Sequence, residues 1–246
     1  MQRASQQLLI SFRSLSNAAP AAIGSIVHEN VSDHQIEYLK EPCIAVDEND
    51  RVLGSVSKAL SHQKDTSVLH RAFSVFIFNT DKELLLQKRA PSKITFPNKW
   101  TNACCSHPLY SSDECIEHNA IGIRRAARRK LEHELGISKN AYELDDFNFV
   151  GRFLYSADSD DYWCERELDY VLILKNFKGQ LNSNPDEVSA TKFVDKKILA
   201  SLINARPEAF SPWFTLLHNR GWLEKWWNNL DDLSKFRNST KITKLN

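Results

Sequence analysis

The order of apolar and polar residues along the chain predicts strands and helices that alternate over most of its length. An almost wholly apolar run at Phe73–Phe78 is typical of a strand buried on both faces. The polar turn Asn79–Lys82 follows and should return the chain as a second strand. The same pattern predicts further strands at Cys43–Asp47, Arg51–Leu53, Leu84–Leu86, Phe147–Tyr155 and Leu168–Leu174.

Helical spacing is clearest in the middle of the chain, where it ends at Gly136, a residue type typical of helix stops. The segment Ser111–Glu114 has the S-x-x-E pattern of a capping box and predicts that this helix opens there. Ser201–Asn204 and the Trp-rich Pro212–Leu233 are also expected to be helical. Strands mixed with helices indicate an α/β (α+β) domain rather than a helical bundle or a β-sandwich.

The first 28 residues differ from the rest in composition. They contain no Asp or Glu, and their two arginines lie among Ser, Gln, Ala and Leu. This composition is typical of an organellar transit peptide, and a disordered tail is the alternative. We therefore expect an N-terminal extension at residues 1–35 and one domain at residues 36–246. The protein is expected inside the cell: in the mitochondrion if the extension is a targeting peptide, otherwise in the cytoplasm or peroxisome.

Composition narrows the class of protein further. The chain has 246 residues, of which 42% are hydrophobic and 26% charged, as is ordinary for a globular protein. No apolar run approaches the roughly 20 residues of a membrane-spanning helix. The net charge of +1 gives no general attraction to nucleic acid or anionic lipid. An odd number of cysteines, five, argues against a disulfide framework and for a reducing compartment.

Metal-type side chains form a first candidate site: His62, His70, His107, Glu165 and Glu167. Glu165 and Glu167 are two positions apart just before an apolar strand, so both carboxylates should lie on one face. Two charges there need compensation from a cation or solvent. Three imidazoles and two carboxylates suit Mn²⁺, Mg²⁺ or Zn²⁺. Taken singly, each histidine is better explained as a surface or hydrogen-bonded core residue.

A second candidate is the segment Thr101–Pro108, in which Cys105 precedes His107 by two positions. Such a cysteine could be a reactive thiol, although a structural buried cysteine is the commoner case. If the segment is extended, Cys104 and Cys105 point in opposite directions. The segment alone leaves open which of the two is functional, and a packing role is expected for the other.

The third candidate is Arg129–Ile137, which resembles the Nudix box R-E-U-x-E-E-x-G-U, where U is aliphatic. In that box a helix presents carboxylates to a metal–diphosphate unit. Lys130 and His133 stand where the box has acids, so Glu134 alone remains at its metal-facing core. The basic run Arg124–Lys130 could instead be a nucleic-acid patch, but a solvated helix face is expected, with the inward-facing members attracting diphosphate.

Taken together, the candidates resemble the type I isopentenyl-diphosphate isomerases of the Nudix superfamily. The resemblance covers about Ile36–Phe236 and is carried by Leu69–Ser74, Leu86–Arg89, Ser92–Lys93, Thr101–Leu109, Trp163–Tyr170 and Ser211–Trp213. It implies a Nudix-like mixed β-sheet packed between helices in a single domain. This family interconverts isopentenyl and dimethylallyl diphosphate by protonating an alkene to a tertiary carbocation and removing a proton from another carbon.

The resemblance also implies residue roles. Cys105 would act on one face of the substrate, and Glu167, assisted by Tyr155, on the other. The ring of Trp213 would stabilise the cation without attacking it. The first metal would be held by His62, His70, His107, Glu165 and Glu167, and a Mg²⁺ arriving with the diphosphate would meet Glu134. Phosphate oxygens would be bound by Lys58, Arg89 and Lys93, for which ordinary surface charge is the alternative.

Two other functions compete with isomerisation. A Nudix hydrolase needs several box carboxylates to hold metals and activate water, which Lys130 and His133 disfavour. A non-catalytic binding module for nucleic acid or protein is disfavoured as well, because such a module need not retain the acid, base, metal and anchor residues. The expected partner is a small allylic or homoallylic diphosphate, with no nucleic acid and no membrane. We expect a monomer; a dimer is the alternative, since Trp222, Trp226 and Trp227 could cover either core or a partner.

Overall fold

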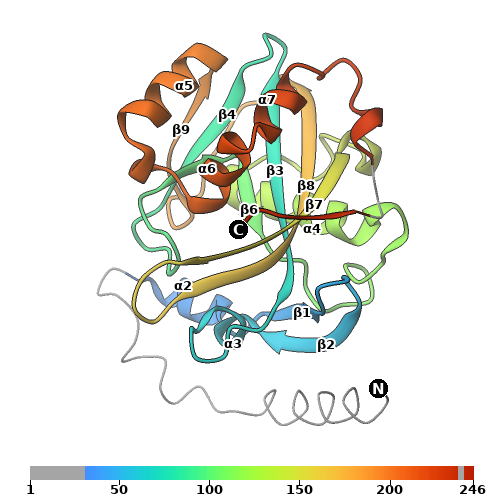
Figure 1. Ribbon diagram of the computed structural model, residues 1–246, viewed down its shortest axis with the longest axis vertical. Helices are drawn as coiled ribbons and strands as arrows, with labels where there is room; N and C mark the ends of the chain where they lie inside the picture. The colour runs from blue at the N-terminus through green and yellow to red at the C-terminus, as the bar shows by residue number, and fades with distance from the viewer. Residues whose placement is uncertain (1–30, 238–240) are drawn as a thin grey trace.

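The computed structural model of the chain describes residues 31–237 and 241–246. The prediction of a transit peptide or disordered tail at residues 1–28 therefore lies outside the described residues, and the boundary at residue 35 stays a prediction. Within the described part, strands and helices build one mixed sheet with helices on both faces (Figure 1). The expected α/β (α+β) class in a single domain is confirmed. None of the described helices is long and apolar enough to cross a membrane.

The sheet has ten strands, which are β1 (Pro42–Val46), β2 (Val52–Ser57), β3 (His70–Asn79), β4 (Leu84–Arg89), β5 (Trp100–Asn102), β6 (Cys104–Ser106), β7 (Asn148–Asp158), β8 (Cys164–Phe177), β9 (Val188–Val194) and β10 (Ile242–Lys244). Its main path is β10-β7-β8-β3-β1-β2, while β4 pairs with β3, β5 and β9, and β6 pairs with β3. β3 and β8 are parallel, and β7 and β8 are antiparallel. The strand predictions of the sequence are confirmed.

The helices are α2 (Asp33–Tyr38), α3 (Lys58–His62), α4 (Ile121–Leu135), α5 (Lys196–Ala205), α6 (Pro212–Asn219) and α7 (Trp222–Trp227). Short 3₁₀ turns are η2 (His118–Ala120), η3 (Leu144–Asp146), η4 (Pro207–Ala209) and η5 (Ser234–Phe236). In Figure 1, β1, β2 and α3 lie at one end of the molecule, and α5 and α7 lie at the other.

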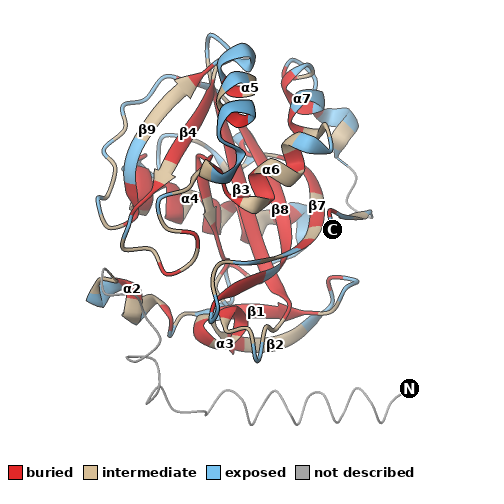
Figure 2. Cartoon of the chain, turned by 60° about the vertical axis from the view of Figure 1, so that its left-hand side comes forward, coloured by how far each residue is buried: buried red, intermediate tan, exposed pale blue. Residues whose placement is uncertain are grey.

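Apolar side chains fill both faces of the sheet, and the buried residues concentrate along its central strands (Figure 2). On one face, Phe73 and Leu172 belong to a core shared with α4. On the other face, Phe76 packs against Trp226 of α7, with ring centroids 5.6 Å apart. Trp226 and Trp227 are buried in this chain's own core, so the Trp-rich segment covers core rather than a partner.

The expected capping box at Ser111–Glu114 is wrong, because α4 begins only at Ile121. Ser111 Oγ does accept a hydrogen bond from the Glu114 N–H at 3.3 Å. The Glu114 carboxylate, however, turns inward to the Arg129 guanidinium, 2.6 Å away, and to the Leu109 N–H. A pairing with a residue in the following helix thus replaces the local cap.

The predicted stop at Gly136 is confirmed. This glycine has a φ of +67°, and its N–H donates to Glu132 O in the pattern of a left-handed helix cap. The segment Pro212–Leu233 is helical over most of its length, as expected, but the chain breaks at Gly221 into α6 and α7, and α7 ends at Trp227. Gly221 has a φ of +74°, a backbone conformation that glycine adopts without steric cost.

Candidate active site

Strand register brings the candidate residues together. β3 lies parallel to β8 with His70 opposite Glu167, and β7 runs antiparallel to β8 with Tyr155 opposite the same Glu167. On the other side of β3, β6 sets Cys105 opposite Ser74. Residues that are distant in sequence therefore face one region of the molecule because three strand pairings align them.

Three histidines and one carboxylate form a compact buried cluster of His62, His70, His107 and Glu167, in which one potential ligand atom from each lies within 4.8 Å of the others. Glu167 Oε1 lies 2.7 Å from His107 Nε2, 3.6 Å from His70 Nε2 and 3.7 Å from His62 Nε2. Burial acts to raise the pKa of Glu167, but its contacts with the histidines, led by the 2.7 Å hydrogen bond with His107, outweigh burial and hold this pKa well below the usual range. The carboxylate is therefore ionised.

The hydrogen bonds behind the cluster suit a divalent cation. His62 Nδ1 lies 2.8 Å from Lys58 O, and His70 Nδ1 lies 2.8 Å from Val68 O. A carbonyl only accepts, so both Nδ1 atoms carry the proton and both Nε2 lone pairs point toward Glu167. His70 Nε2 is buried with no hydrogen-bond partner among the described residues. Burial also lowers the pKa of His62 to about 4, which keeps this ring neutral, as a metal ligand must be.

Glu165 lies beside this cluster rather than within it. The Tyr155 hydroxyl lies 2.7 Å from Glu165 Oε2 and also contacts Glu167 Oε2, so it bridges the two carboxylates. Thr95 Oγ1 donates to Glu165 Oε1 at 3.2 Å. Burial, together with the neighbouring Glu167 carboxylate, raises the pKa of Glu165 to about 8. The two carboxylates share one sheet face, as their spacing predicts, whereas metal ligation by Glu165 stays a prediction.

The Cys105 thiol and the Trp213 indole meet at a common acceptor. Trp213 Nε1 lies 3.0 Å from Cys105 Sγ and 3.0 Å from Asn102 Oδ1, and the thiol donates to the same Oδ1 at 3.0 Å. Burial raises the pKa of Cys105 to about 12, so the thiol is protonated at neutral pH. Cys104 points the other way into the α4 core, as expected, and all five cysteines are free.

Asn102 is a functional candidate that the sequence did not single out. Its side-chain amide donates to Val75 O at 3.1 Å and to Cys104 O at 2.9 Å. These two carbonyls fix the orientation of the amide, so Oδ1 must face Cys105 and Trp213. Its only sequence signal is its place in the Thr101–Pro108 segment.

One pocket collects most of the predicted site residues. Its lining includes Lys58, His62, Arg89, Lys93, Cys105, His107, Tyr155, Glu165, Glu167 and Trp213. His70 lies behind it within the histidine cluster, and Glu134 is buried outside the lining. The wall of the pocket also includes Gln35, Tyr38 and Leu39. No sequence motif indicated a functional role for this segment.

The three predicted phosphate anchors lie at this pocket with partners of their own. Lys58 Nζ is 3.5 Å from Glu41, and Lys93 pairs with the buried Glu187. Arg89 Nε and Nη2 donate to Thr95 O at 3.2 and 2.7 Å, and its guanidinium lies 5.6 Å from the Trp213 ring centroid. The alternative interpretation as ordinary surface charge does not fit Arg89 or Lys93, because both side chains are largely buried.

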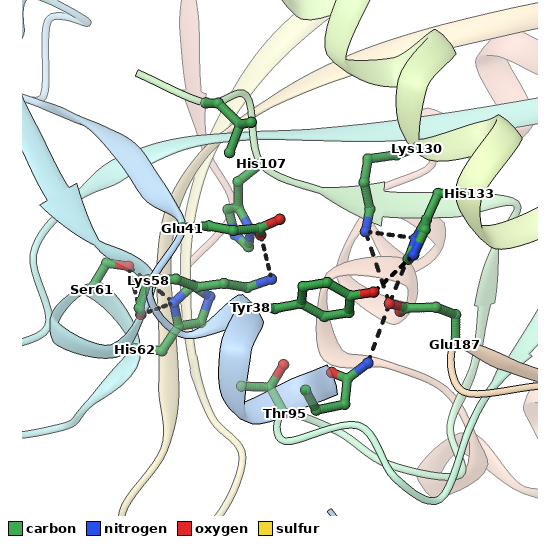
Figure 3. A network of polar contacts seen from close by, with 12 residues as sticks. Tyr38, Glu41, Lys58, Ser61, His62, Thr95, His107, Lys130, His133 and Glu187 are labelled. Atoms are coloured by element: carbon green, nitrogen blue, oxygen red, sulfur yellow. Dashed lines mark hydrogen bonds and ion pairs between the residues drawn. The ribbon is translucent and has the colours of Figure 1, made fainter. Parts of the chain in front are cut away.

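A second cluster of polar side chains lies next to the pocket and includes Lys130 and His133 of the degenerate Nudix box (Figure 3). Lys130 Nζ lies 3.4 Å from Glu134 Oε1, and His133 accepts or donates a 2.9 Å hydrogen bond with the Tyr38 hydroxyl. Glu187, which no sequence motif marked, lies 3.9 Å from Lys130 and 3.7 Å from His133. Nearby lysines outweigh the effect of burial and hold the pKa of Glu187 well below its usual range.

The basic run Arg124–Lys130 has inward-facing members, as expected, and their attraction of diphosphate stays a prediction. Lys130 and Arg124 are only 4% and 7% exposed. Arg129 pairs with Glu114, and Arg124 Nη1 pairs with Asp145 at 2.8 Å. Acidic partners far away in sequence stabilise these charges inside the fold, which a local charge pattern cannot reveal.

Comparisons with known proteins place this geometry in a family. Residues 68–214 match the NUDIX domain family. An isopentenyl-diphosphate delta-isomerase of Gibberella zeae is 44% identical over 220 residues, covering 87% of this chain and 86% of the relative. The Mus musculus isomerase is 41% identical over 222 residues, covering 88% and 97%. A chloroplastic isomerase of Arabidopsis thaliana is 48% identical over 202 residues, covering 78% and 68%. The chain belongs to the NUDIX domain family and, within it, to the isopentenyl-diphosphate delta-isomerases.

Proposed function

We propose that this isomerase interconverts isopentenyl and dimethylallyl diphosphate by a metal-dependent protonation and deprotonation through a tertiary carbocation. The observation that supports the proposal is a chain of contacts around one pocket. The Trp213 indole N–H lies 3.0 Å from Cys105 Sγ, and its ring centroid is 6.3 Å from that of Tyr155. The Tyr155 hydroxyl in turn contacts Glu167. An acid, an aromatic ring and a base therefore surround the same space.

Moving a double bond requires one proton to be added and another removed. The Cys105 thiol is protonated, and the Glu167 carboxylate is ionised. The two groups thus stand in complementary protonation states, one able to give a proton and the other to accept it. The Tyr155 hydroxyl can hold the Glu167 oxygen in place by hydrogen bonding.

The carbocation must be shielded from nucleophiles. The Trp213 side chain is 2% exposed and packs edge to face against Phe96, with ring centroids 5.6 Å apart. An aromatic face stabilises positive charge without forming a bond to it, and aromatic walls keep water from the cation. Arg89 on the Trp213 ring places positive charge where the diphosphate would enter.

We infer that the first divalent metal, Mn²⁺, Mg²⁺ or Zn²⁺, is held by His62, His70, His107 and Glu167, with Glu165 as the fifth candidate. A cation bound there would add positive charge beside Glu167 and so favour its ionised form further. A Mg²⁺ that accompanies the diphosphate would use Glu134, whose buried Oε1 has the Lys130 ammonium as an ion-pair partner at 3.4 Å and no hydrogen bond to the described residues. Lys58, Arg89 and Lys93 would bind the phosphate oxygens.

Hydrolysis is the alternative within the family fold, and the box does not favour it. Lys130 Nζ lies 3.4 Å from Glu134 and carries positive charge where a hydrolytic box supplies further acids. Binding and activating water requires several carboxylates on metal ions. The monomeric state and the mitochondrial, cytoplasmic or peroxisomal location both stay predictions.

The test of the proposed function is an NMR time course of isopentenyl diphosphate with the purified chain and Mg²⁺ in D₂O. We expect dimethylallyl diphosphate to form with solvent deuterium incorporated, because both proton transfers involve exchangeable enzyme groups. Release of phosphate without a shifted double bond would contradict isomerisation and favour hydrolysis. Unchanged substrate, with metal content confirmed, would favour a binding module.

Asn102→Ala is expected to lower kcat by about 10- to 100-fold with a much smaller change in KM. Removing Oδ1 takes away the acceptor that orients both the Cys105 thiol and the Trp213 indole, and misplacing reacting groups costs factors of this size. Steady-state kinetics would measure the split between kcat and KM. The control is Asn102→Gln, which keeps an amide side chain but moves the amide away from its present position. A proportional loss of kcat and thermal stability in both variants would indicate a purely structural role.

A further inference from the structure

A second large cavity opens on the face of β7 and β8 that carries Phe149 and Tyr170, away from the catalytic pocket. Its volume is about 1030 Å³, at the upper end of the range of small-molecule pockets. Side chains alternate along β8, so Tyr170 faces this cavity while Glu165 and Glu167 face the catalytic pocket. The two cavities share no lining residue.

The lining of this cavity is rich in arginine. Five arginines line it, together with the carboxylates of Asp50, Glu117 and Asp145, and they are Arg51, Arg71, Arg124, Arg152 and Arg237. Arg51 and Arg237 are exposed, and Arg51 pairs with Asp47 at 2.8 Å. The other three, Arg71, Arg124 and Arg152, are largely buried and each pairs with a carboxylate. A buried guanidinium is costly unless its donors are well paired, so a donor left without a partner here favours an anionic ligand.

Asp50 holds two of these arginines in fixed positions. Its carboxylate accepts from Arg71 Nε at 2.7 Å and from Arg152 Nη1 at 2.6 Å, and it also contacts the Tyr170 hydroxyl. Both guanidinium groups lie about 6 Å from the Tyr170 ring centroid, at 6.0 and 5.9 Å. The Phe149 ring lies 5.5 Å from Tyr170, and these two largely buried side chains, 9% and 8% exposed, form the aromatic floor of the cavity.

The other two carboxylates are exposed and easily displaced. Asp145, which pairs with Arg124 at 2.8 Å, has 97% of its side chain exposed, and Glu117, which pairs with Arg71 at 2.7 Å, has 62% exposed. Ion pairs with such exposed partners contribute little to stability. A ligand phosphate could therefore take their places at little cost.

Arg124 supplies an unpaired donor inside the cavity. Its side chain is 9% exposed, and its Nε is buried with no hydrogen-bond partner among the described residues. Burial lowers the pKa of Arg124 despite the opposing effect of Asp145, so the pairing compensates this charge only in part. An oxygen-rich anion would complete the hydrogen bonding of this guanidinium.

The start of α4 adds partial positive charge to the same cavity. Asn119 and Ala120 line it directly before the 15-residue helix, and no side chain in the described part of the chain caps the helix N-terminus. Both residues have left-handed backbone angles, with φ of +50° and +54°, which is uncommon for alanine. Helix N-termini favour phosphate groups, and strained residues often mark ligand sites.

We propose that this cavity binds a phosphorylated small molecule that carries a flat ring, of the nucleotide class, at a site separate from catalysis. Arg71, Arg124 and the start of α4 would bind the phosphate groups, and the ring would lie on Phe149 and Tyr170. Arg71 directly follows His70 in β3, so the ligand would bind one residue away from the histidine cluster. The proposal is independent of how the catalytic pocket works.

The test follows backbone amide NMR signals of the full chain, with its metal bound, during titration with ADP and separately with inorganic diphosphate. We expect saturable shifts at residues 49–52 and 117–124 with ADP. Arg124→Gln should weaken ADP binding by about 10-fold, because it removes a charge-assisted contact. Asp145→Asn should tighten binding, because it removes the competing carboxylate.

The matched control is Arg125→Gln, a change of the same charge on the same helix at a residue outside the cavity lining. Equal weakening in Arg124→Gln and Arg125→Gln would overturn the proposal in favour of general charge attraction. Shifts confined to the catalytic pocket would also overturn it. ADP that binds no more tightly than inorganic diphosphate would overturn the role of the aromatic floor. Asp145→Asn is expected to strengthen ADP binding, so the test does not depend on whether Arg124→Gln folds.

Discussion

Cys105→Ala is expected to lower kcat by at least about 10³-fold while leaving the fold and the bound metal unchanged, since general acid–base groups contribute rate factors of up to about 10⁴. The thiol is the proton-bearing group that faces Trp213, and burial keeps it protonated. Alanine removes the sulfur atom and with it the transferable proton. Deuterium incorporation into dimethylallyl diphosphate, followed by NMR in D₂O, measures the effect directly.

Cys104→Ala is the matched control for this variant. The two cysteines are adjacent, but the Cys104 side chain packs in the α4 core and is fully buried there. The control should lose some stability, about 1 kcal/mol for a small core truncation, and keep its kcat. If Cys105→Ala retains more than a tenth of the wild-type kcat, or if both variants lose activity equally, the thiol is not the proton-transfer group.

The sequence predicted the central strands well because their burial leaves a strong local signal. β3 is buried over nearly its whole length, and the apolar run Phe73–Phe78 reports this directly. The end of α4 at Gly136 could also be predicted from a local signal, since the left-handed φ of this glycine is a property of that one position. The start of α4 was mispredicted because the partner of Glu114 is Arg129, a contact that exists only once the fold has formed.

The site residues divide in the same way. Residues that match family motifs, such as Cys105 and Glu167, were named from the sequence, and strand register then brings them to one pocket. Asn102 and Glu187 were missed because their importance lies in hydrogen bonds and ion pairs with residues distant in the chain. The register that sets His70 opposite Glu167 cannot be obtained from the spacing of either segment alone.

Glu167→Gln is expected to produce the other large loss, because it removes the anion at the centre of the histidine cluster and the proton-accepting oxygen at once. The amide is close in size to the carboxylate but carries no charge to offset a divalent cation. We expect metal affinity to fall by at least about 10-fold, and kcat by at least about 10³-fold even at saturating metal. Elemental analysis after dialysis measures the first effect, and deuterium exchange in D₂O measures the second.

Glu165→Gln is the matched control, and it separates two views of the metal site. The five-ligand set expected from the sequence predicts a similar loss of metal from both variants. The geometry predicts otherwise, since Glu165 contacts Tyr155 and Thr95 and lies outside the group of four side chains within 4.8 Å of one another. Glu165→Gln should therefore retain most of its metal while Glu167→Gln does not. Equal metal loss in the two variants would restore the five-ligand site, because both carboxylates would then have to reach the same cation.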